Sequence, residues 1–215
     1  MRLVFLGSGA FALPTLRWLA HSGHDIPLVI TQPAKGAGRG RRLTRTPVAA
    51  EAESFGMTVE AVEDVNEPSV VSRVAALKAD AGVVIAFGQK LGPVFRDTAA
   101  GGYINLHASL LPKYRGAAPI NWAIIRGEQR TGVTVFRIVE RMDAGPILST
   151  RWTEIKPEET TGELHDRLAA IGVDAMKAAL DLFASNPCPP GEPQDDSQAS
   201  KAPKLKASAA PVSCF

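Results

Sequence analysis

The feature that most constrains the fold is the alternation of short apolar runs with amphipathic helical patterns along the first 185 residues. The chain opens on the apolar run Arg2–Leu6, and the later run Gly82–Phe87 is continuously apolar, as expected of a strand covered on both faces. This alternation is typical of β-α-β units, which build a mostly parallel sheet with helices on both faces. The sequence therefore predicts an α/β protein.

The same pattern predicts where the individual elements lie. Strands are expected at Arg2–Leu6, Leu28–Thr31, Met57–Val62, Gly82–Phe87, Tyr103–His107, Gly132–Val139 and Pro146–Ile155. Helices are expected at Phe11–His21, Thr46–Phe55, Asn66–Leu77 and from Thr160 to about Ser185. After residue 186 the composition shifts to proline, serine and lysine, which predicts a linker or tail over residues 187–215 behind a domain of residues 1–186.

Composition and charge exclude several classes of protein. The 24 basic and 22 acidic residues give a net charge of +2, so any nucleic-acid site must be local. Cys188 and Cys214 form neither a disulfide framework nor a zinc spacing, and no histidine–acid spacing suggests a metal site. No apolar run is long enough to cross a bilayer. We expect a cytoplasmic monomer with no metal and no membrane attachment.

The turn after the first strand matches a loose dinucleotide-binding fingerprint. Gly7–Ala12 has the G-x-G-x-x-A spacing at the start of a helix, where a pyrophosphate could lie. The fingerprint also needs an acidic residue about twenty positions on, but the second strand ends in Thr31–Ala34 without one. We therefore expect a tight strand-to-helix turn rather than a nicotinamide site.

A denser group of polar residues follows the strand at Tyr103–His107. Strand alternation places Asn105 and His107 on one face, at the carboxyl end of a strand, where open α/β sheets bind ligands. An amide beside an imidazole can stabilise a carbonyl oxygen that becomes an oxyanion. Taken alone, the pair is better explained by side chains that hydrogen-bond loop backbone.

Asp143 lies in a turn between the last two predicted strands, in the same half of the domain. It could approach His107, orient the imidazole and handle a proton through water. On spacing alone, an Asx turn explains Asp143 better.

The order of several segments resembles the folate-dependent formyltransferases. The central segments are Asn105–Pro112, Arg115–Pro119 and Asp143–Pro146. The earlier segments Thr31–Pro33, Gly38–Leu43 and Thr46–Val48 resemble the methionyl-tRNA formyltransferase branch of that family. The resemblance runs in order from residue 1 to about residue 185 and implies a Rossmann-like formyltransferase fold.

The resemblance also implies a reaction, in which the formyl group of 10-formyltetrahydrofolate passes to the α-amino group of methionyl initiator tRNA. By analogy, Asn105 would bind the formyl oxygen and His107 would stabilise the oxyanion. Asp143 would act on His107 and help to remove the proton of the amine. Folate-binding residues implied by the family are Ser109, Leu110, Leu111 and Pro112 on one segment and Phe87, Gly88 and Gln89 on another.

A basic segment lies between Gln32 and Ala50 and contains no acidic residue before Glu51. Its cations are Lys35, Arg39, Arg41, Arg42 and Arg45. Charge alone predicts a solvated loop. The resemblance implies that Lys35, Arg39, Arg41 and Arg42 contact the tRNA, with Arg39 at the matching Gly-Arg-Gly position.

Two departures from the family leave alternatives open. Ser8-Gly9 stands where the family has Thr-Pro, and the family continues after an Ala-Pro-Lys segment into a C-terminal β-barrel, which we expect this chain to lack after Lys204. A natural short form, a fragment and a frameshift product all agree with this ending. The acceptor could also be a small amine, such as an amino sugar nucleotide or glycinamide ribotide, or the chain could be an inactive folate- or RNA-binding remnant.

Overall fold

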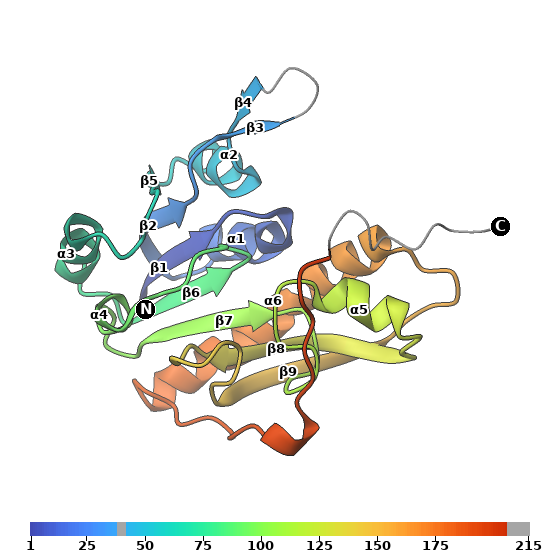
Figure 1. The fold of residues 1–215 in the computed structure, drawn as a ribbon. Coiled ribbons are helices and arrows are strands. Elements are labelled where there is room, and N and C mark those ends of the chain that lie inside the picture. The colour runs from blue at the N-terminus through green and yellow to red at the C-terminus, as the bar shows by residue number, and fades with distance from the viewer. Residues whose placement is uncertain (38–41, 206–215) are drawn as a thin grey trace.

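The computed structural model describes residues 1–37 and 42–205 of the chain. These residues include a seven-stranded sheet in the order β5-β2-β1-β6-β7-β8-β9 (Figure 1). The strands are β1 (Arg2–Gly7), β2 (Asp25–Thr31), β5 (Val59–Ala61), β6 (Ala81–Ile85), β7 (Tyr103–His107), β8 (Arg130–Arg137) and β9 (Ile147–Glu154). Neighbours from β5 to β7 are parallel, whereas β8 is antiparallel to both β7 and β9. The predicted α/β class, with a mixed but mostly parallel sheet, is confirmed.

Helices cover both faces of this sheet, as the alternation predicts. One face carries α1 (Leu13–Ala20), α2 (Pro47–Ser54) and α6 (Thr161–Ser185), and the other carries α3 (Pro68–Ala76) and α4 (Pro93–Arg96). The interior strand β1 shows the division: Phe5 belongs to the core under α1 and α6, and Leu6 to the core under α3. Both side chains are fully buried, because each strand face has its own helical layer.

The longest helix, α6, begins where the sequence predicts, and the structure shows a capping box there. Thr160 accepts from the amide of Glu163, and the Glu163 carboxylate accepts in return from the amide of Thr160. The helix lies behind β7, β8 and β9 (Figure 1) and buries Leu164, Leu168 and Met176. It thereby supports the half of the sheet that carries His107.

Several short elements were not predicted. They are the hairpin β3 (Lys35–Ala37) and β4 (Arg42–Thr44), the helices α4 and α5 (Pro119–Ile125), and the 3-10 turns η1 (Ala10–Ala12) and η2 (Asp196–Gln198). The hairpin projects from the body of the domain near α2 (Figure 1). It carries part of the basic segment.

The chain after α6 returns over the domain, and we call residues 187–205 the C-terminal strap. The amide of Ile147 at the start of β9 donates to the carbonyl of Glu192 at 2.7 Å, and the Glu192 amide donates back at the same distance. Farther along, Ala202 is fully buried. Figure 1 shows the strap ending beside α5. The prediction of a linker from composition did not anticipate these contacts.

No helix within residues 1–37 and 42–205 is both long enough and apolar enough to span a bilayer.

Candidate active site

The site lies at the carboxyl end of β7, the last parallel strand of the sheet. His107 ends this strand and is 7% exposed, whereas Asn105, two residues earlier on the same face, is half-buried. The side-chain amide of Asn105 makes no hydrogen bond with any residue that the structure describes. An unpaired amide at the ligand edge of the sheet is free to bind a substrate oxygen.

The orientation of the His107 ring is fixed by the loop that follows the strand. Nε2 lies 2.8 Å from the carbonyl oxygen of Tyr114. Because a carbonyl only accepts, Nε2 carries the proton of that bond. Nδ1 is therefore the nitrogen that faces the site, and it can donate a hydrogen bond only when the imidazole is protonated.

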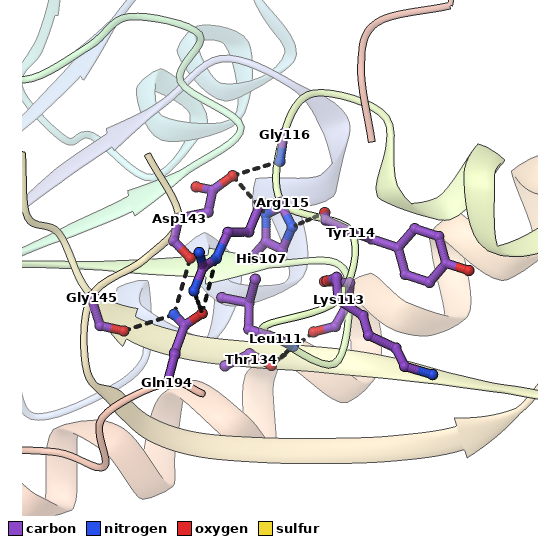
Figure 2. Close-up of polar contacts among 11 residues, drawn as sticks. His107, Leu111, Lys113, Tyr114, Arg115, Gly116, Thr134, Asp143, Gly145 and Gln194 are labelled. Atoms are coloured by element: carbon purple, nitrogen blue, oxygen red, sulfur yellow. Dashed lines mark hydrogen bonds and ion pairs between the residues drawn. The ribbon is translucent and has the colours of Figure 1, made fainter. Parts of the chain in front are cut away.

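Asp143 approaches this ring from the turn between β8 and β9 (Figure 2). Its Oδ2 lies 3.9 Å from Nδ1 of His107, which is too long for a direct hydrogen bond. The same oxygen accepts from the amide of Gly116 at 2.8 Å. The structure thus brings together His107 and Asp143, which are 36 residues apart in the sequence, and leaves Asn105 on the same strand face.

The side chain of Tyr114 anchors the loop that follows β7. Its hydroxyl donates to Glu128 at 2.5 Å, and the guanidinium of Arg126 lies 5.1 Å from the centre of its ring. Burial and the bond to Glu128 raise the pKa of the Tyr114 phenol. The side chain thus points away from the site while its carbonyl serves His107.

The predicted folate segment at residues 109–112 is mostly turned inward. Ser109 is fully buried, and its hydroxyl donates to the carbonyl of Lys113 at 2.6 Å. Thr134 donates to the Ser109 carbonyl at 2.7 Å and accepts from the amide of Leu111 at 3.1 Å. Leu111 is buried, whereas Leu110 and Pro112 are half-buried. The polar atoms of Ser109 therefore hold the loop in place, and contact with folate at these four residues stays a prediction.

The other predicted folate segment presents backbone rather than side chains. The Phe87 ring is buried in the core, and the Gln89 amide is bound to the carbonyl of Val62 and the amide of Val65. Ala86 and Gly88 are exposed. This segment can offer main-chain groups to a ligand, and its contact with folate also stays a prediction.

The turn after β1 has the tight geometry that the sequence predicts. The amides of Ser8 and Gly9 both donate to the carbonyl of Ala86 at 3.2 Å. In a dinucleotide site such amides point at the pyrophosphate, but here they are used within the protein.

A pocket of about 350 Å³ lies beside this turn. Its wall includes Ser8, Gln32, Lys35, Arg45 and Gly88. Lys35, at the base of the hairpin, donates to the side-chain oxygen of Gln32, and Arg45 forms an ion pair with Glu53. The basic segment therefore starts at the rim of a pocket near the carboxyl ends of β1 and β6.

The rest of the basic segment is described only in part. Arg42 belongs to strand β4, whereas Arg39 and Arg41 lie outside the described residues. Contact of these residues with tRNA stays a prediction.

Within the described ranges, no three histidine, cysteine, aspartate or glutamate side chains are grouped so that they could hold a metal ion.

Sequence reasoning missed the groups that hold the site residues. These are the carbonyl of Tyr114, the amide of Gly116 and the side chain of Gln194 on the strap. The first two belong to backbone and carry no sequence signal. Gln194 lies in the Pro-rich stretch, far from Asp143 in the sequence, so its contact with Asp143 could not be predicted.

This arrangement defines an α/β enzyme with an amide, an imidazole and a carboxylate at the ligand edge of a mixed sheet. The family model described as Formyl transferase matches residues 1–180. The chain therefore belongs to the formyl transferase family, and the resemblance found in the sequence is confirmed.

Relatives in this family are similar over nearly the whole chain. The methionyl-tRNA formyltransferase of Solibacter usitatus is 46% identical over 206 residues, which are 96% of this chain and 66% of the relative. That of Moorella thermoacetica is 43% identical with the same coverage. The chain thus spans slightly less than two thirds of the length of these relatives.

Solved structures share the fold at lower identity. Phosphoribosylglycinamide formyltransferase from Anaplasma phagocytophilum superimposes with a TM-score of 0.73 at 21% identity, covering 86% of this chain and 88% of that one. HypX from Aquifex aeolicus in complex with tetrahydrofolic acid gives a TM-score of 0.69 at 18% identity, covering 96% of this chain and 30% of that one.

Proposed function

We propose that this chain transfers the formyl group of 10-formyltetrahydrofolate to the α-amino group of methionyl initiator tRNA. The observation that carries the proposal is the unpaired amide of Asn105 on the strand face that ends in His107, with Asp143 beside the ring. The two relatives at 43–46% identity, named as methionyl-tRNA formyltransferases, support this choice of acceptor.

Two of the three groups stabilise charge on the formyl oxygen. The Asn105 amide donates to this oxygen, and the protonated His107 donates from Nδ1 because Nε2 is already bound to Tyr114. Both donors sit on a rigid strand, so they need little rearrangement when the amine adds to the carbonyl carbon. The remaining chemistry needs an acceptor for the proton of the amine.

Asp143 serves as that acceptor and balances the charge of the imidazolium. Its carboxylate lies 3.9 Å from Nδ1 and is held by the Gly116 amide, so one of its oxygens has a fixed place. Proton transfer by a positioned carboxylate contributes roughly 10²- to 10⁴-fold to a rate. The donor supplies the formyl carbon and a leaving nitrogen, and as the bond between them breaks this nitrogen takes up the proton that Asp143 removed from the amine.

The folate donor fits the exposed backbone at Ala86 and Gly88. Main-chain donors and acceptors there can pair with the edge of a pterin. The segment follows β6, which lies next to β7 in the sheet. The tetrahydrofolic acid in the complex of HypX, a protein with the same fold, supports a folate ligand.

The basic segment is the part of the chain that we assign to the acceptor tRNA. Lys35 lines the 350 Å³ pocket, and the hairpin that carries Arg42 projects from the body of the domain near α2 (Figure 1). Cations on such a projection suit the phosphates of an acceptor stem. We propose residues 1–186 as the catalytic domain of a cytoplasmic monomer, with contacts to tRNA from Lys35, Arg39, Arg41 and Arg42.

An acceptor panel tests this function. The purified chain is incubated with 10-formyltetrahydrofolate, labelled in the formyl group, and with charged initiator tRNA, glycinamide ribotide or an amino sugar nucleotide. We expect label on methionyl-tRNA only. Transfer to a small amine but not to tRNA would show that the small amine, and not methionyl-tRNA, is the acceptor. Folate binding without any transfer would indicate an inactive binding protein.

A further inference from the structure

The C-terminal strap binds the loop that holds both acid–base groups of the site. The amide of Tyr114 donates to the hydroxyl of Ser200 at 2.9 Å, and the amide of Arg115 donates to the Ser200 carbonyl at 2.8 Å. The Arg115 carbonyl accepts from the amide of Ala202 at 2.7 Å. Since the Tyr114 carbonyl binds His107 and the Gly116 amide binds Asp143, each of these main-chain groups has a partner in the strap or the site.

The approach of the strap to this loop is close. Gly116 has φ +124°, and a Cβ atom there would lie 2.7 Å from the carbonyl oxygen of Ala202. A side chain would therefore separate the two segments. The loop and the strap behave as one packed unit around the site.

Gln194 makes the most direct connection between the strap and Asp143. Its side-chain nitrogen donates to the carbonyl of Asp143 at 3.0 Å and to that of Gly145 at 2.8 Å. Its side-chain oxygen accepts from Nε and Nη2 of Arg115 at 3.1 and 2.6 Å. Figure 2 shows the amide between the Asp143 turn and the Arg115 guanidinium. Both N–H groups of the amide and its oxygen are thus occupied.

The backbone of Asp143 needs such support. Its φ is +51°, in the left-handed region that residues other than glycine rarely adopt. A strained residue keeps this conformation only when its surroundings hold it. The Gly116 amide holds the carboxylate, and the Gln194 amide holds the main chain on both sides of Ala144.

Arg115 is itself anchored to the strap. Its Nη2 also donates to Asp196 at 2.9 Å, and Arg141 donates to the same carboxylate oxygen. These bonds, that of Arg141 first, hold the pKa of Asp196 below its usual range. Arg115 therefore presents a fixed surface to Gln194.

We propose that Gln194 is a positioning residue for Asp143: through its two donors it holds the Asp143 turn so that the carboxylate stays aligned with Gly116 and His107. This inference rests on the proposed function for its effect on rate. It makes part of the strap, which is remote in sequence, a component of the catalytic centre.

The test replaces Gln194 in the full chain with leucine, which removes both donors at similar volume. We expect kcat for formyl transfer to fall about 10- to 100-fold with KM for both substrates within about twofold, because the groups that bind substrate remain. The matched control is Gln198→Leu, since Gln198 is exposed and its side-chain amide contacts Ser197, at 3.5 Å, and no other residue that the structure describes. An equal loss in both variants would contradict the proposal.

A double-mutant cycle separates positioning from general stability. If Gln194 acts through Asp143, Gln194→Leu should cost little further rate in an Asp143→Ala background. The full 10- to 100-fold loss in that background would overturn the proposal. If Gln194→Leu lowers the folded fraction, Gln194→Asn carries the same cycle, because its shorter amide keeps the chemistry but cannot reach both carbonyls.

Hydrogen exchange gives a readout that does not need the reaction. The Gly116 amide should exchange at least about tenfold faster in Gln194→Leu than in wild type, because its acceptor on Asp143 is no longer held. In Gln198→Leu its exchange rate should equal that of wild type. Unchanged protection would refute the positioning role. Faster exchange in a chain that formylates no acceptor would support positioning and refute the proposed function instead.

Discussion

Nε2 of His107 donates to the carbonyl of Tyr114 at 2.8 Å, and this single bond decides which nitrogen of the ring faces Asp143. The bond joins the last residue of a buried strand to a loop that the strap holds from outside. The acid–base geometry of the site thus depends on three segments that are far apart in the sequence.

Replacement of His107 by alanine should remove most of the activity. We expect kcat to fall by about 10²- to 10⁴-fold, because the formyl oxygen would lose one of its two proposed donors. The orphaned Tyr114 carbonyl should cost about 1 kcal/mol of stability, measured by urea unfolding. His165→Ala is the control, since His165 lies on α6 beside Asp166. A rate within about tenfold of wild type would refute the role of His107.

Two substitutions at Asp143 should separate charge from backbone strain. Asp143→Asn keeps an acceptor for Gly116 and tolerates a positive φ, so we expect a loss of kcat of about 100-fold or more with little change in Tm. Asp143→Ala should lose similar activity and also about 1–2 kcal/mol of stability. Equal stability of the two variants would contradict the strain argument.

Removal of four positive charges from the basic segment should weaken binding of the acceptor tRNA and leave binding of the formyl donor unchanged. A variant with alanine at Lys35, Arg39, Arg41 and Arg42 should raise KM for charged tRNA about tenfold or more and weaken its dependence on salt. KM for the formyl donor should stay unchanged. The control is Lys156→Ala, on the loop between β9 and α6. A parallel rise of both KM values would argue against a segment that faces tRNA.

The buried phenol of Tyr103 predicts a loss of stability at high pH. Burial raises its pKa to about 12, whereas an unfolded tyrosine ionises near 10. The neutral phenol is thus favoured in the folded chain, so its contribution is complete below about pH 10 and is lost between about pH 10 and 12. We expect this to amount to about 3 kcal/mol.

Comparison with Tyr103→Phe isolates this effect. The variant loses the hydrogen bond to Thr98, about 1 kcal/mol, but should lose less stability than wild type as the pH rises. Urea unfolding at a series of pH values between 9 and 11 measures the two slopes. Identical slopes would show that Tyr103 does not titrate as described.

The sequence was sufficient for the parts of the fold that depend on local pattern. Tyr103–His107 was predicted with the observed bounds, because a buried strand needs apolar residues at fixed spacing. The beginning of α6 was predicted at Thr160, which is the N-cap residue in the structure. The hairpin at Lys35–Thr44 was missed because its strands have three residues each and sit in a Gly- and Arg-rich stretch without alternation.

The site could be predicted only in part for a similar reason. Asn105 and His107 share a strand, so their common face follows from the period of two. The approach of Asp143, and the bonds of Gln194 and Ser200 to distant backbone, depend on how the chain returns over the sheet. Composition predicted a linker where the structure has the strap, because a stretch of prolines and polar residues does not reveal which backbone groups it will hydrogen-bond.

Single-turnover transfer to methionyl-tRNA by wild type and by Asn105→Leu tests the central claim most directly. The claim is that the side-chain amide of Asn105, which is unpaired among the described residues, stabilises the formyl oxygen during transfer to this acceptor. We predict that wild type forms formyl-methionyl-tRNA and that Asn105→Leu forms it at least about 100-fold more slowly with unchanged tRNA binding. No product from folded wild type, or a near-normal rate for the variant, would contradict the account.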